Sequence, residues 1–305
     1  MQIGMVGLGR MGGGMAQRLL RGGHEIIVTD PDVEKVALLE AEGARGASDI
    51  KGMVNELKRP RVIWLMLPTG DVTNQNIKLL NTLLSPEDTV VNGGNTYYKD
   101  SKRHAIQASK NGIHFLDAGT SGGIWGVTEG YSIMIGGEAG PYDRLLPAIR
   151  TLAPARDRGF GHVGPSGSGH FVKMIHNGIE YGIMQAYAEG FELLQSKKEF
   201  GLDLAGISEI WRHGSVVRSW LLDLAAAAFA EDGQLAHLTS YVDDTGEGRW
   251  TVNESVEMAV PAPVITAALQ QRFRSRQDNP MAGRVIAALR HQFGGHSVRT
   301  ATPPE

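Results

Sequence analysis

The first 21 residues place a glycine-rich turn between a short apolar strand and a helix, and no other feature constrains the fold as strongly. The strand pattern Ile3–Val6 leads into Gly7-Leu8-Gly9-Arg10-Met11-Gly12, which fits G-x-G-x-x-G, and a helical pattern follows over Gly13–Arg21. In such a turn the first glycine permits the tight bend, the second a close approach of phosphate, and the third close helix–strand packing. A glycine-rich turn without a ligand is the alternative, but the strand before it and the helix after it favour a pyrophosphate at the helix N-terminus. We therefore predict that residues 7–12 bind a dinucleotide.

An acidic residue follows the second expected strand, Glu25–Val28. Asp30 lies 18 residues after Gly12, where a carboxylate accepts hydrogen bonds from ribose hydroxyls and repels a 2′-phosphate. No arginine follows it in Pro31-Asp32-Val33. The sequence therefore favours NAD over NADP, although a structural Asp in an Asp-Pro turn is the alternative.

Short apolar runs alternate with helical patterns through the first half of the chain, which is typical of parallel βαβ units. We predict a Rossmann-type doubly wound α/β sheet. Its expected strands are Ile3–Val6, Glu25–Val28, Arg61–Met66, Thr89–Asn92 and His114–Asp117, with Tyr131–Gly136 and Gly159–Val163 as further candidates. Leu67 and Pro68, directly after the third of these strands, are assigned to the same cofactor site.

The composition changes to Gly, Ser and Pro around Gly159–Gly169, which indicates a domain junction. Long helical patterns follow over Gly169–Phe200, Asn253–Arg274 and Pro280–Gln292. At 305 residues the chain also exceeds the size at which one core keeps growing. We predict an NAD-binding domain of residues 1–165 and an all-α C-terminal domain of residues 166–305.

Composition narrows the functional class further. The chain has no cysteine, which excludes disulfides, thiolate metal sites and cysteine nucleophiles. Its net charge of -3 provides no electrostatic footprint for nucleic acid. No window approaches the roughly 20 apolar residues that span a bilayer, and no secretory leader pattern is present. We expect a cytoplasmic protein without nucleic-acid or membrane partners.

Five polar side chains share one face of the helical pattern Gly169–Phe200. Lys173, His176, Asn177, Glu180 and Tyr181 stand at i, i+3, i+4, i+7 and i+8, within an arc of roughly 140°. A solvated face is the ordinary explanation. The other residues on much of the circumference are apolar, as in a helix buried nearly all round: Phe171, Val172, Met174, Ile175, Ile179, Ile183 and Met184. Burying Lys, His and Glu costs free energy unless they pair or act, so we expect a functional face.

Five segments together resemble the decarboxylating 6-phosphogluconate dehydrogenases of the pentose phosphate pathway. They are the helix Lys173-Met174-Ile175-His176-Asn177-Gly178-Ile179-Glu180-Tyr181, the loops Asn92-Gly93-Gly94-Asn95-Thr96 and Ser121-Gly122-Gly123, Arg272 after Val260-Pro261, and the tail Arg290-His291-Gln292-Phe293-Gly294-Gly295-His296. The chain looks like the short, NAD-preferring branch of this family. The resemblance implies oxidative decarboxylation of 6-phosphogluconate to ribulose 5-phosphate and CO2 with reduction of NAD.

The resemblance also implies a role for each matching residue. Neutral Lys173 takes the C3 hydroxyl proton as hydride leaves, and apolar surroundings lower its pKa for that task. Glu180 protonates C1 of the resulting enediol, which requires a raised pKa. No metal is implied. The substrate-binding residues are Asn95 (which also touches the cofactor), Ser121, Gly122, Gly123, His176 and Asn177, with Tyr181, Arg272, Arg290 and His296 around the phosphate.

Two segments depart from the long-form pattern. Thr245 stands nearest to where a phosphate-binding Lys is expected, and Ile124-Trp125 occupy positions that are acidic in long forms. A helical domain of about 140 residues is small for closing a pocket alone. We expect the tail to complete a neighbour's site in a homodimer or homotetramer, the alternative being a disordered basic tail with frayed residues Ser297–Glu305.

Two other functions stay open. Related β-hydroxyacid dehydrogenases, such as the 3-hydroxyisobutyrate type, share the nucleotide domain, the Ser-Gly-Gly loop and the helix Lys and Asn. They lack the Glu180–Tyr181 continuation and the phosphate-binding tail, and release of CO2 separates the two reactions. The second alternative is a non-catalytic regulator that senses NAD redox state, which a fully effective Lys173→Ala variant would favour.

Overall fold

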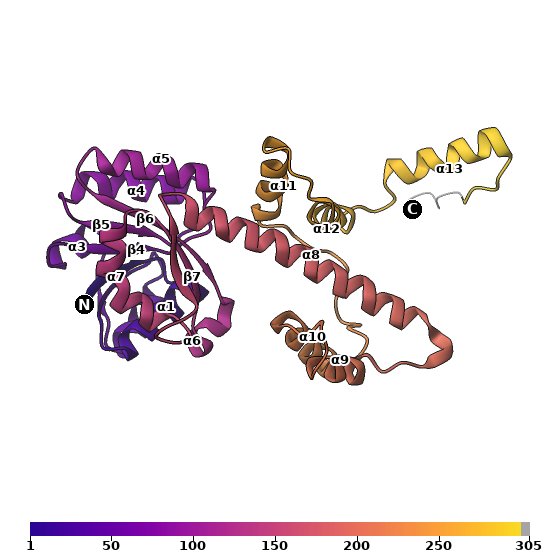
Figure 1. Ribbon diagram of the computed structural model, residues 1–305, viewed down its shortest axis with the longest axis horizontal. Helices are drawn as coiled ribbons and strands as arrows, with labels where there is room; N and C mark the ends of the chain where they lie inside the picture. The colour runs from indigo at the N-terminus through magenta and orange to yellow at the C-terminus, as the bar shows by residue number, and fades with distance from the viewer. Residues whose placement is uncertain (300–305) are drawn as a thin grey trace. The chain divides into compact units, whose positions relative to one another are not determined.

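A mostly parallel sheet forms the first half of the chain, as the alternating pattern predicts (Figure 1). The computed structural model describes residues 1–299, so the last six residues of the predicted helical domain lie outside it. Within that range the sheet has the strand order β3-β2-β1-β4-β5-β6-β7-β8, and β7 runs antiparallel to β6. The strands are β1 Gln2–Val6, β2 Glu25–Thr29, β3 Arg45–Gly46, β4 Val62–Leu65, β5 Thr89–Asn92, β6 His114–Ser121, β7 Ser132–Gly136 and β8 Phe160–Gly164. The predicted Rossmann-type fold is confirmed.

Helices cover both faces of this sheet because its strands carry apolar side chains on both sides. The helices are α1 Arg10–Arg21, α2 Val33–Ala41, α3 Ile50–Glu56, α4 Asp71–Leu83, α5 Tyr98–Ser109, α6 Gly126–Glu129 and α7 Ala139–Leu152. Ile3 and Met5 of β1 belong to one core with α1 and α7, whereas Val6 belongs to a second core with α3 and α4. This alternation follows from the two-residue period of a strand.

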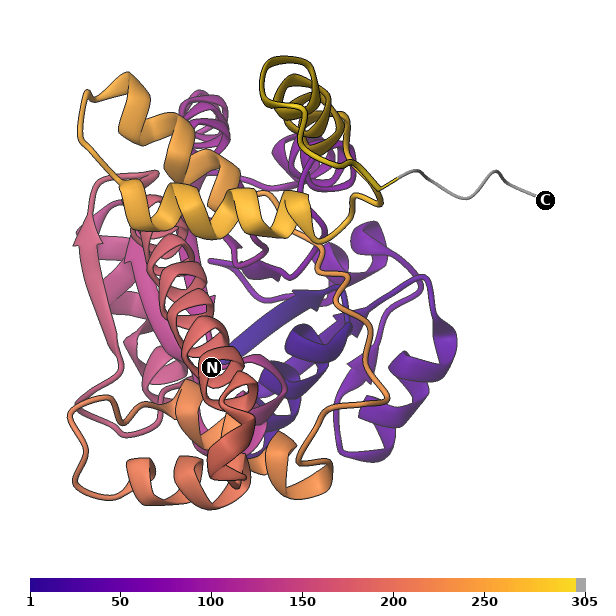
Figure 2. The same cartoon turned by 90° about the vertical axis from the view of Figure 1, so that its right-hand side faces the viewer.

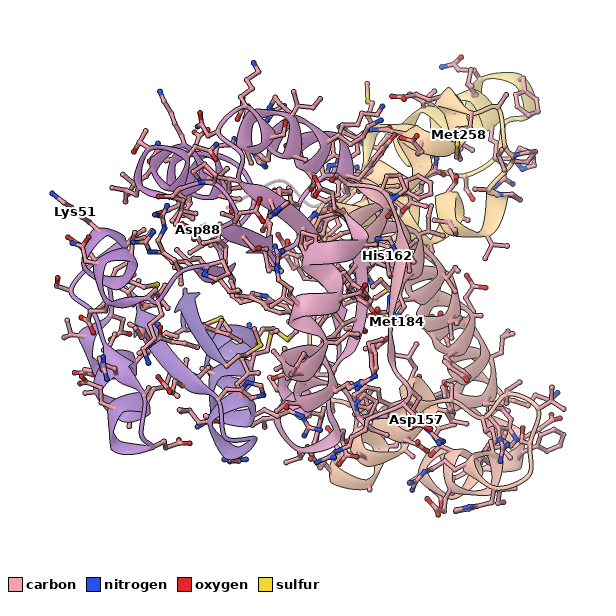
Figure 3. All side chains as sticks on the ribbon, turned by 60° about the vertical axis from the view of Figure 1, so that its left-hand side comes forward. Lys51, Asp88, Asp157, His162, Met184 and Met258 are labelled. Carbon is pink, nitrogen blue, oxygen red and sulfur yellow. The ribbon has the colours of Figure 1, made fainter. Side chains whose placement is uncertain are left out.

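One buried carboxylate stabilises the N-terminal ends of the neighbouring strands β4 and β5. Asp88, labelled in Figure 3, is fully buried and accepts hydrogen bonds from the backbone N–H groups of Arg61 (2.7 Å) and Ser85 (3.0 Å). It also forms an ion pair with the Arg61 guanidinium at 3.0 Å. Both carboxylate oxygens of Asp88 therefore have partners within the fold, so we assign this residue a structural role.

The second half is helical, as predicted. Its elements are α8 Ser168–Ser196, the short 3-10 helix η2 Lys198–Phe200, α9 Leu204–Arg212, α10 Trp220–Glu231, α11 Glu247–Glu257, α12 Pro263–Arg274 and α13 Met281–Gly294. The compact units of the chain are Met1–Ile179 and Glu180–Glu305, so α8, a continuous helix in Figures 1 and 2, contributes to both. None of the helices in residues 1–299 combines the length and apolar character that a membrane crossing requires.

The single helix expected over Asn253–Arg274 is wrong. The chain leaves α11 at Glu257, passes Ala259 with a positive φ of 55°, and starts α12 at Pro263. Pro261 and Pro263 lack the N–H that a continuing helix needs, and the second occupies the favoured position in the first turn of a new helix. The apolar periodicity predicts one helix across this stretch, whereas the two prolines divide it into two.

Candidate active site

The glycine turn has the geometry that its sequence predicts. Gly7 has a φ of +89°, a conformation that side chains rarely adopt. A Cβ on Gly12 would lie 2.0 Å from the carbonyl oxygen of Gly7, so only glycine lets α1 approach this closely. A Cβ on Gly9 would meet nothing within 4 Å, which leaves open space at the N-terminus of α1. This geometry fits a phosphate group in front of the helix.

Asp30 lies directly beside this turn. Its Oδ2 accepts a hydrogen bond from the N–H of Leu8 at 2.6 Å, and its Oδ1 accepts one from the N–H of Asp32 at 2.9 Å. Both carboxylate oxygens are thereby oriented at the end of β2. A fixed negative charge at this place fits ribose hydroxyls and disfavours a 2′-phosphate.

The predicted cofactor residues meet where the strand order reverses. β1 and β4 are neighbours, and the chain continues from them to opposite sides of the sheet. In such sheets ligands bind beyond the carboxyl ends of the strands at this switch point. The glycine turn follows β1, and Leu67 and Pro68 follow β4, so both flank the expected position.

The loop of residues 92–96 follows β5 and packs tightly against the segment after β4. A Cβ on Gly94 would lie 2.2 Å from the carbonyl oxygen of Leu67. At its start Asn92 is fully buried, and its Nδ2 donates to Thr96 Oγ1 at 3.0 Å. The side chain of Asn95 is exposed. The loop thus has a buried, braced base and presents Asn95 at the edge where the cofactor is expected.

The Ser121-Gly122-Gly123 segment begins at the end of β6. Gly122 and Gly123 have φ angles of 135° and 54°, so both occupy conformations that favour glycine. A Cβ on Gly122 would lie 3.2 Å from the ring of Tyr131. Burial of this tyrosine raises its pKa to about 12. The tight turn leaves Ser121 partly accessible on β6.

The first turns of α8 rest on the backbone of the sheet. Lys173 is 8% exposed, and a Cβ on Gly119 of β6 would lie 2.4 Å from the Cβ of Lys173. Gly169 is equally constrained, because its Cβ would lie 2.2 Å from the carbonyl oxygen of Asp117. Further along the helix, Nδ1 of His176 lies 3.1 Å from Oδ1 of Asn177. The expected burial of the Lys173 side chain is confirmed.

A second group of predicted residues meets in the helical unit. The guanidinium carbon of Arg272 lies 3.5 Å from the ring centroid of Tyr181, a cation–π contact, and the Tyr181 hydroxyl accepts the N–H of Thr245 at 3.3 Å. Nearby, Arg249 and Arg276 both pair with Asp244, and Arg249 holds the pKa of that carboxyl below its usual range. Tyr181, Arg272 and Thr245 therefore lie together, and Arg272 supplies a cationic group of the kind that binds phosphate.

Among the described residues, the tail residues Arg290 and His296 do not join the group of Tyr181, Arg272 and Thr245. Arg290 lies on α13 and His296 just beyond it, and every described residue from Met281 onward is exposed. Met281, Val285, Leu289 and Phe293 follow one another at intervals of four residues, so an apolar stripe of α13 is uncovered.

The expectation that the long helix α8 is buried nearly all round is wrong, because Ile179, Ile183 and Met184 of α8 are exposed.

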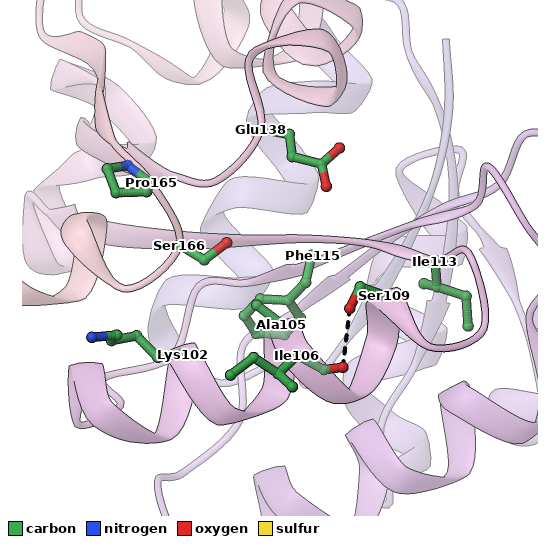
Figure 4. Close-up of a pocket in the computed structure, with 9 residues that line it drawn as sticks. All are labelled: Lys102, Ala105, Ile106, Ser109, Ile113, Phe115, Glu138, Pro165 and Ser166. Atoms are coloured by element: carbon green, nitrogen blue, oxygen red, sulfur yellow. Dashed lines mark hydrogen bonds between the residues drawn. The ribbon is translucent and has the colours of Figure 1, made fainter.

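A cavity of about 320 Å³ lies beside α5 in the first unit, and it is separate from the predicted site residues (Figure 4). Its lining residues include Lys102, Ile106, Phe115, Glu138 and Ser166, and none of the predicted site residues. Within residues 1–299 no group of three or more His, Asp or Glu side chains is arranged to hold a metal ion.

Both halves of the chain match models of known protein families. Residues 2–164 match the model of the NAD binding domain of 6-phosphogluconate dehydrogenase, and residues 169–288 match that of the enzyme's C-terminal domain. The NAD(+)-dependent, decarboxylating 6-phosphogluconate dehydrogenase of Haloferax volcanii is 43% identical over 299 residues, which cover 98% of each chain.

Solved structures show the same relationship. The 6-phosphogluconate dehydrogenase of Plasmodium falciparum matches with a TM-score of 0.83 at 25% identity, over 100% of this chain and 67% of that one. The 3-hydroxyisobutyrate dehydrogenase of Mycobacterium tuberculosis matches with a TM-score of 0.72 at 21% identity, over 95% and 99% of the two chains, which shows a shared fold alone. The chain belongs to the 6-phosphogluconate dehydrogenase family.

Proposed function

We propose that this protein oxidises 6-phosphogluconate with NAD and releases CO2, giving ribulose 5-phosphate. The observation that carries the proposal is the 43% identity, over nearly the whole of both chains, with a relative named as NAD(+)-dependent and decarboxylating. The fixed Asp30 carboxylate beside the glycine turn supports the preference for NAD over NADP.

In this proposal, residues 7–12, Asp30, Leu67, Pro68 and Asn95 hold NAD, which accepts a hydride when bound. The fit is supported by the open space at Gly9 and by the position of the turn at the N-terminus of α1. Ser121, Gly122, Gly123, His176 and Asn177 orient the sugar acid. Tyr181, Arg272, Arg290 and His296 bind its phosphate.

Lys173 and Glu180 perform the proton transfers. Lys173 accepts the proton of the C3 hydroxyl while the C3 hydrogen leaves as hydride, which gives a 3-keto acid. The bond to the carboxyl carbon then breaks, CO2 leaves, and its electron pair remains in an enolate that protonated Lys173 stabilises. Glu180 donates a proton to C1 of this enolate, whose oxygen becomes the ketone of ribulose 5-phosphate. Burial of Lys173 in the first turns of α8 supports its assignment as the base.

We further propose that the functional division falls at residues 165 and 166, between the NAD-binding domain and the helical substrate domain. The matched ranges, 2–164 and 169–288, support this boundary, and the compact units meet later within α8. The cysteine-free, weakly acidic sequence supports a cytoplasmic location without nucleic-acid or membrane partners.

The assay that tests the function follows reduced cofactor and CO2 together. Purified protein receives 6-phosphogluconate with NAD or with NADP, and we expect equal amounts of reduced cofactor and CO2, with higher kcat/KM for NAD. An Asp30→Ala variant should lose this preference, since the charge that repels a 2′-phosphate is gone. Turnover of 3-hydroxyisobutyrate without CO2 would favour the related dehydrogenase, and absence of turnover with either cofactor would overturn the proposal.

The uncovered stripe of α13 supports a shared site in a homodimer or homotetramer, in which the tail of one subunit supplies Arg290 and His296 to its neighbour. Mixing inactive Lys173→Ala and Arg290→Ala chains then creates one intact site in each mixed pair. Random pairing should restore about one quarter of the wild-type activity. The measurement is kcat after joint refolding, with each variant refolded alone as the control. If the mixture stays inactive although mixed oligomers form, the tail does not complete a neighbour's site.

A further inference from the structure

One face of helix α1 packs against the segment that carries the Ser-Gly-Gly sequence. That segment, residues 121–130, connects β6 to β7 and includes the short helix α6. Gly14 and Arg18 are four residues apart on α1, so they lie on the same face of this helix. Both meet the 121–130 segment, Gly14 through the close approach of its backbone and Arg18 through its side chain.

The Arg18 guanidinium joins α1 to two other helices through hydrogen bonds to backbone carbonyls. Its Nε donates to the carbonyl oxygen of Thr151 at 2.8 Å and its Nη2 to that of Ala153 at 2.7 Å, at the end of α7. Its Nη1 donates to the carbonyl oxygens of Thr128 at 3.2 Å and Val127 at 3.4 Å, both in α6. A helix of four residues cannot pair its last carbonyls internally, so Arg18 supplies donors that α6 itself lacks.

The ring of Tyr131 lies between α1 and the 121–130 segment. This residue is fully buried, and its N–H donates to the carbonyl oxygen of Leu152 at 2.8 Å, which fixes it beside α7. A Cβ on Gly126 would lie 2.0 Å from the ring, and a Cβ on Gly14 would lie 2.6 Å from the hydroxyl oxygen. Glycine at both positions therefore lets α6 and α1 pack on the same ring. Among the described residues the buried hydroxyl has no hydrogen-bond partner, so this contact is one of packing.

We propose that Arg18 and Tyr131 are positioning residues that fix the Ser121-Gly122-Gly123 loop relative to the glycine turn before α1. The turn is proposed to hold the cofactor and the loop the sugar acid, so their separation sets the distance between the two reactants. Catalysis depends steeply on that distance, because reacting atoms must approach to about 3–3.5 Å. The inference rests on the proposed function for its effect on catalysis. Neither residue is assigned a contact with substrate or cofactor.

The first test removes the hydrogen bonds of Arg18. Arg18→Met keeps an unbranched apolar stem and loses every donor to α6 and α7. We expect the KM for 6-phosphogluconate to rise and kcat to fall, which lowers kcat/KM about 10–100-fold. The Kd for NAD should stay within about twofold of wild type, because residues 7–12 are unchanged.

His24→Ala is the matched control for this variant. His24 Nε2 lies 2.9 Å from Thr151 Oγ1, so the substitution removes a contact with the same end of α7 and keeps the hydrogen bonds of Arg18. We expect a lower Tm for His24→Ala and an unchanged kcat/KM of the folded protein. A comparable loss of kcat/KM in both variants would show that Arg18 acts only through stability.

The second test disturbs the packing contact and then repairs it. In Gly14→Ala the new Cβ would lie 2.6 Å from the Tyr131 hydroxyl oxygen, and the next atom, Val127 Cβ, is 3.4 Å away. This substitution removes no hydrogen bond and favours the helix, so displacement of the 121–130 segment should by itself lower kcat/KM about tenfold. Tyr131→Phe alone should be nearly neutral, because its hydroxyl has no hydrogen-bond partner among the described residues. In the double variant the space of the hydroxyl accepts the new methyl group, and kcat/KM should return to within about threefold of wild type.

Hydrogen exchange provides a readout that needs no turnover. Without ligand, the amides of residues 122–129 should exchange faster in Arg18→Met and Gly14→Ala than in wild type, His24→Ala or the double variant. Unchanged exchange in Arg18→Met, or a defect of Gly14→Ala that Tyr131→Phe does not repair, would overturn the inference. If wild-type protein does not act on 6-phosphogluconate, the proposed function fails, and the exchange rates still decide whether α1 holds this segment in place.

Discussion

Replacement of Lys173 by methionine should lower kcat by about 10²–10⁴-fold, the usual contribution of a positioned general base. Methionine keeps an unbranched apolar stem of similar length, so the contact of this side chain with β6 at Gly119 is retained. The variant removes only the amine that, in the proposed mechanism, accepts the C3 hydroxyl proton and then stabilises the enolate. Because the proposed cofactor site consists of other residues, NAD affinity should stay within about twofold of wild type.

The matched control is Lys102→Met. Lys102 is an exposed lysine on α5 that lines the separate cavity of Figure 4. This variant should keep the wild-type kcat, while single-turnover measurements on Lys173→Met should show that the hydride step itself has slowed. Retention of more than about one tenth of wild-type kcat by Lys173→Met would remove Lys173 from the role of base.

The parts of the site that are contiguous in sequence could be predicted from it. The glycine turn and the strand and helix around it are specified within 21 residues. The φ angle of Gly7 and the close packing at Gly12 match the predicted turn, and the open space at Gly9 fits a phosphate group. The polar face of α8 follows from helical spacing alone. The catalytic and binding roles of these residues stay predictions.

The contacts between distant segments could not be predicted. Arg18 lies 135 residues from Ala153, whose carbonyl oxygen accepts its hydrogen bond, and no spacing rule brings the two together. Only the packing of α1 against α6 and α7 creates this contact. The apolar stripe of α13 illustrates another limit, because helical periodicity identifies a face to be covered but not the chain that covers it.

A pair of glycine substitutions tests the cofactor turn. Gly12→Ala tests the close packing of α1, and Gly9→Ala tests the space for a phosphate group. In Gly12→Ala the new Cβ would lie 2.0 Å from the Gly7 carbonyl oxygen, so α1 must move away from β1. We expect both a lower Tm of the free protein and loss of measurable NAD binding. In Gly9→Ala the Cβ enters open space, and the φ and ψ angles of -61° and -176° are accessible to alanine. The free protein should therefore lose no more than about 1 kcal/mol, the cost of a poorer helix cap.

NAD affinity should nevertheless fall in Gly9→Ala, because the methyl group occupies the space that a phosphate needs near the helix N-terminus. We expect the Kd for NAD to rise at least about tenfold, a loss of about 1.4 kcal/mol. Titration calorimetry measures the Kd, and thermal unfolding without ligand measures the stability of each variant. Gly140→Ala is the control, since this glycine of α7 also faces open space and lies outside the proposed site. If Gly9→Ala binds NAD as tightly as Gly140→Ala does, the phosphates lie elsewhere and the turn is only a structural connection between β1 and α1.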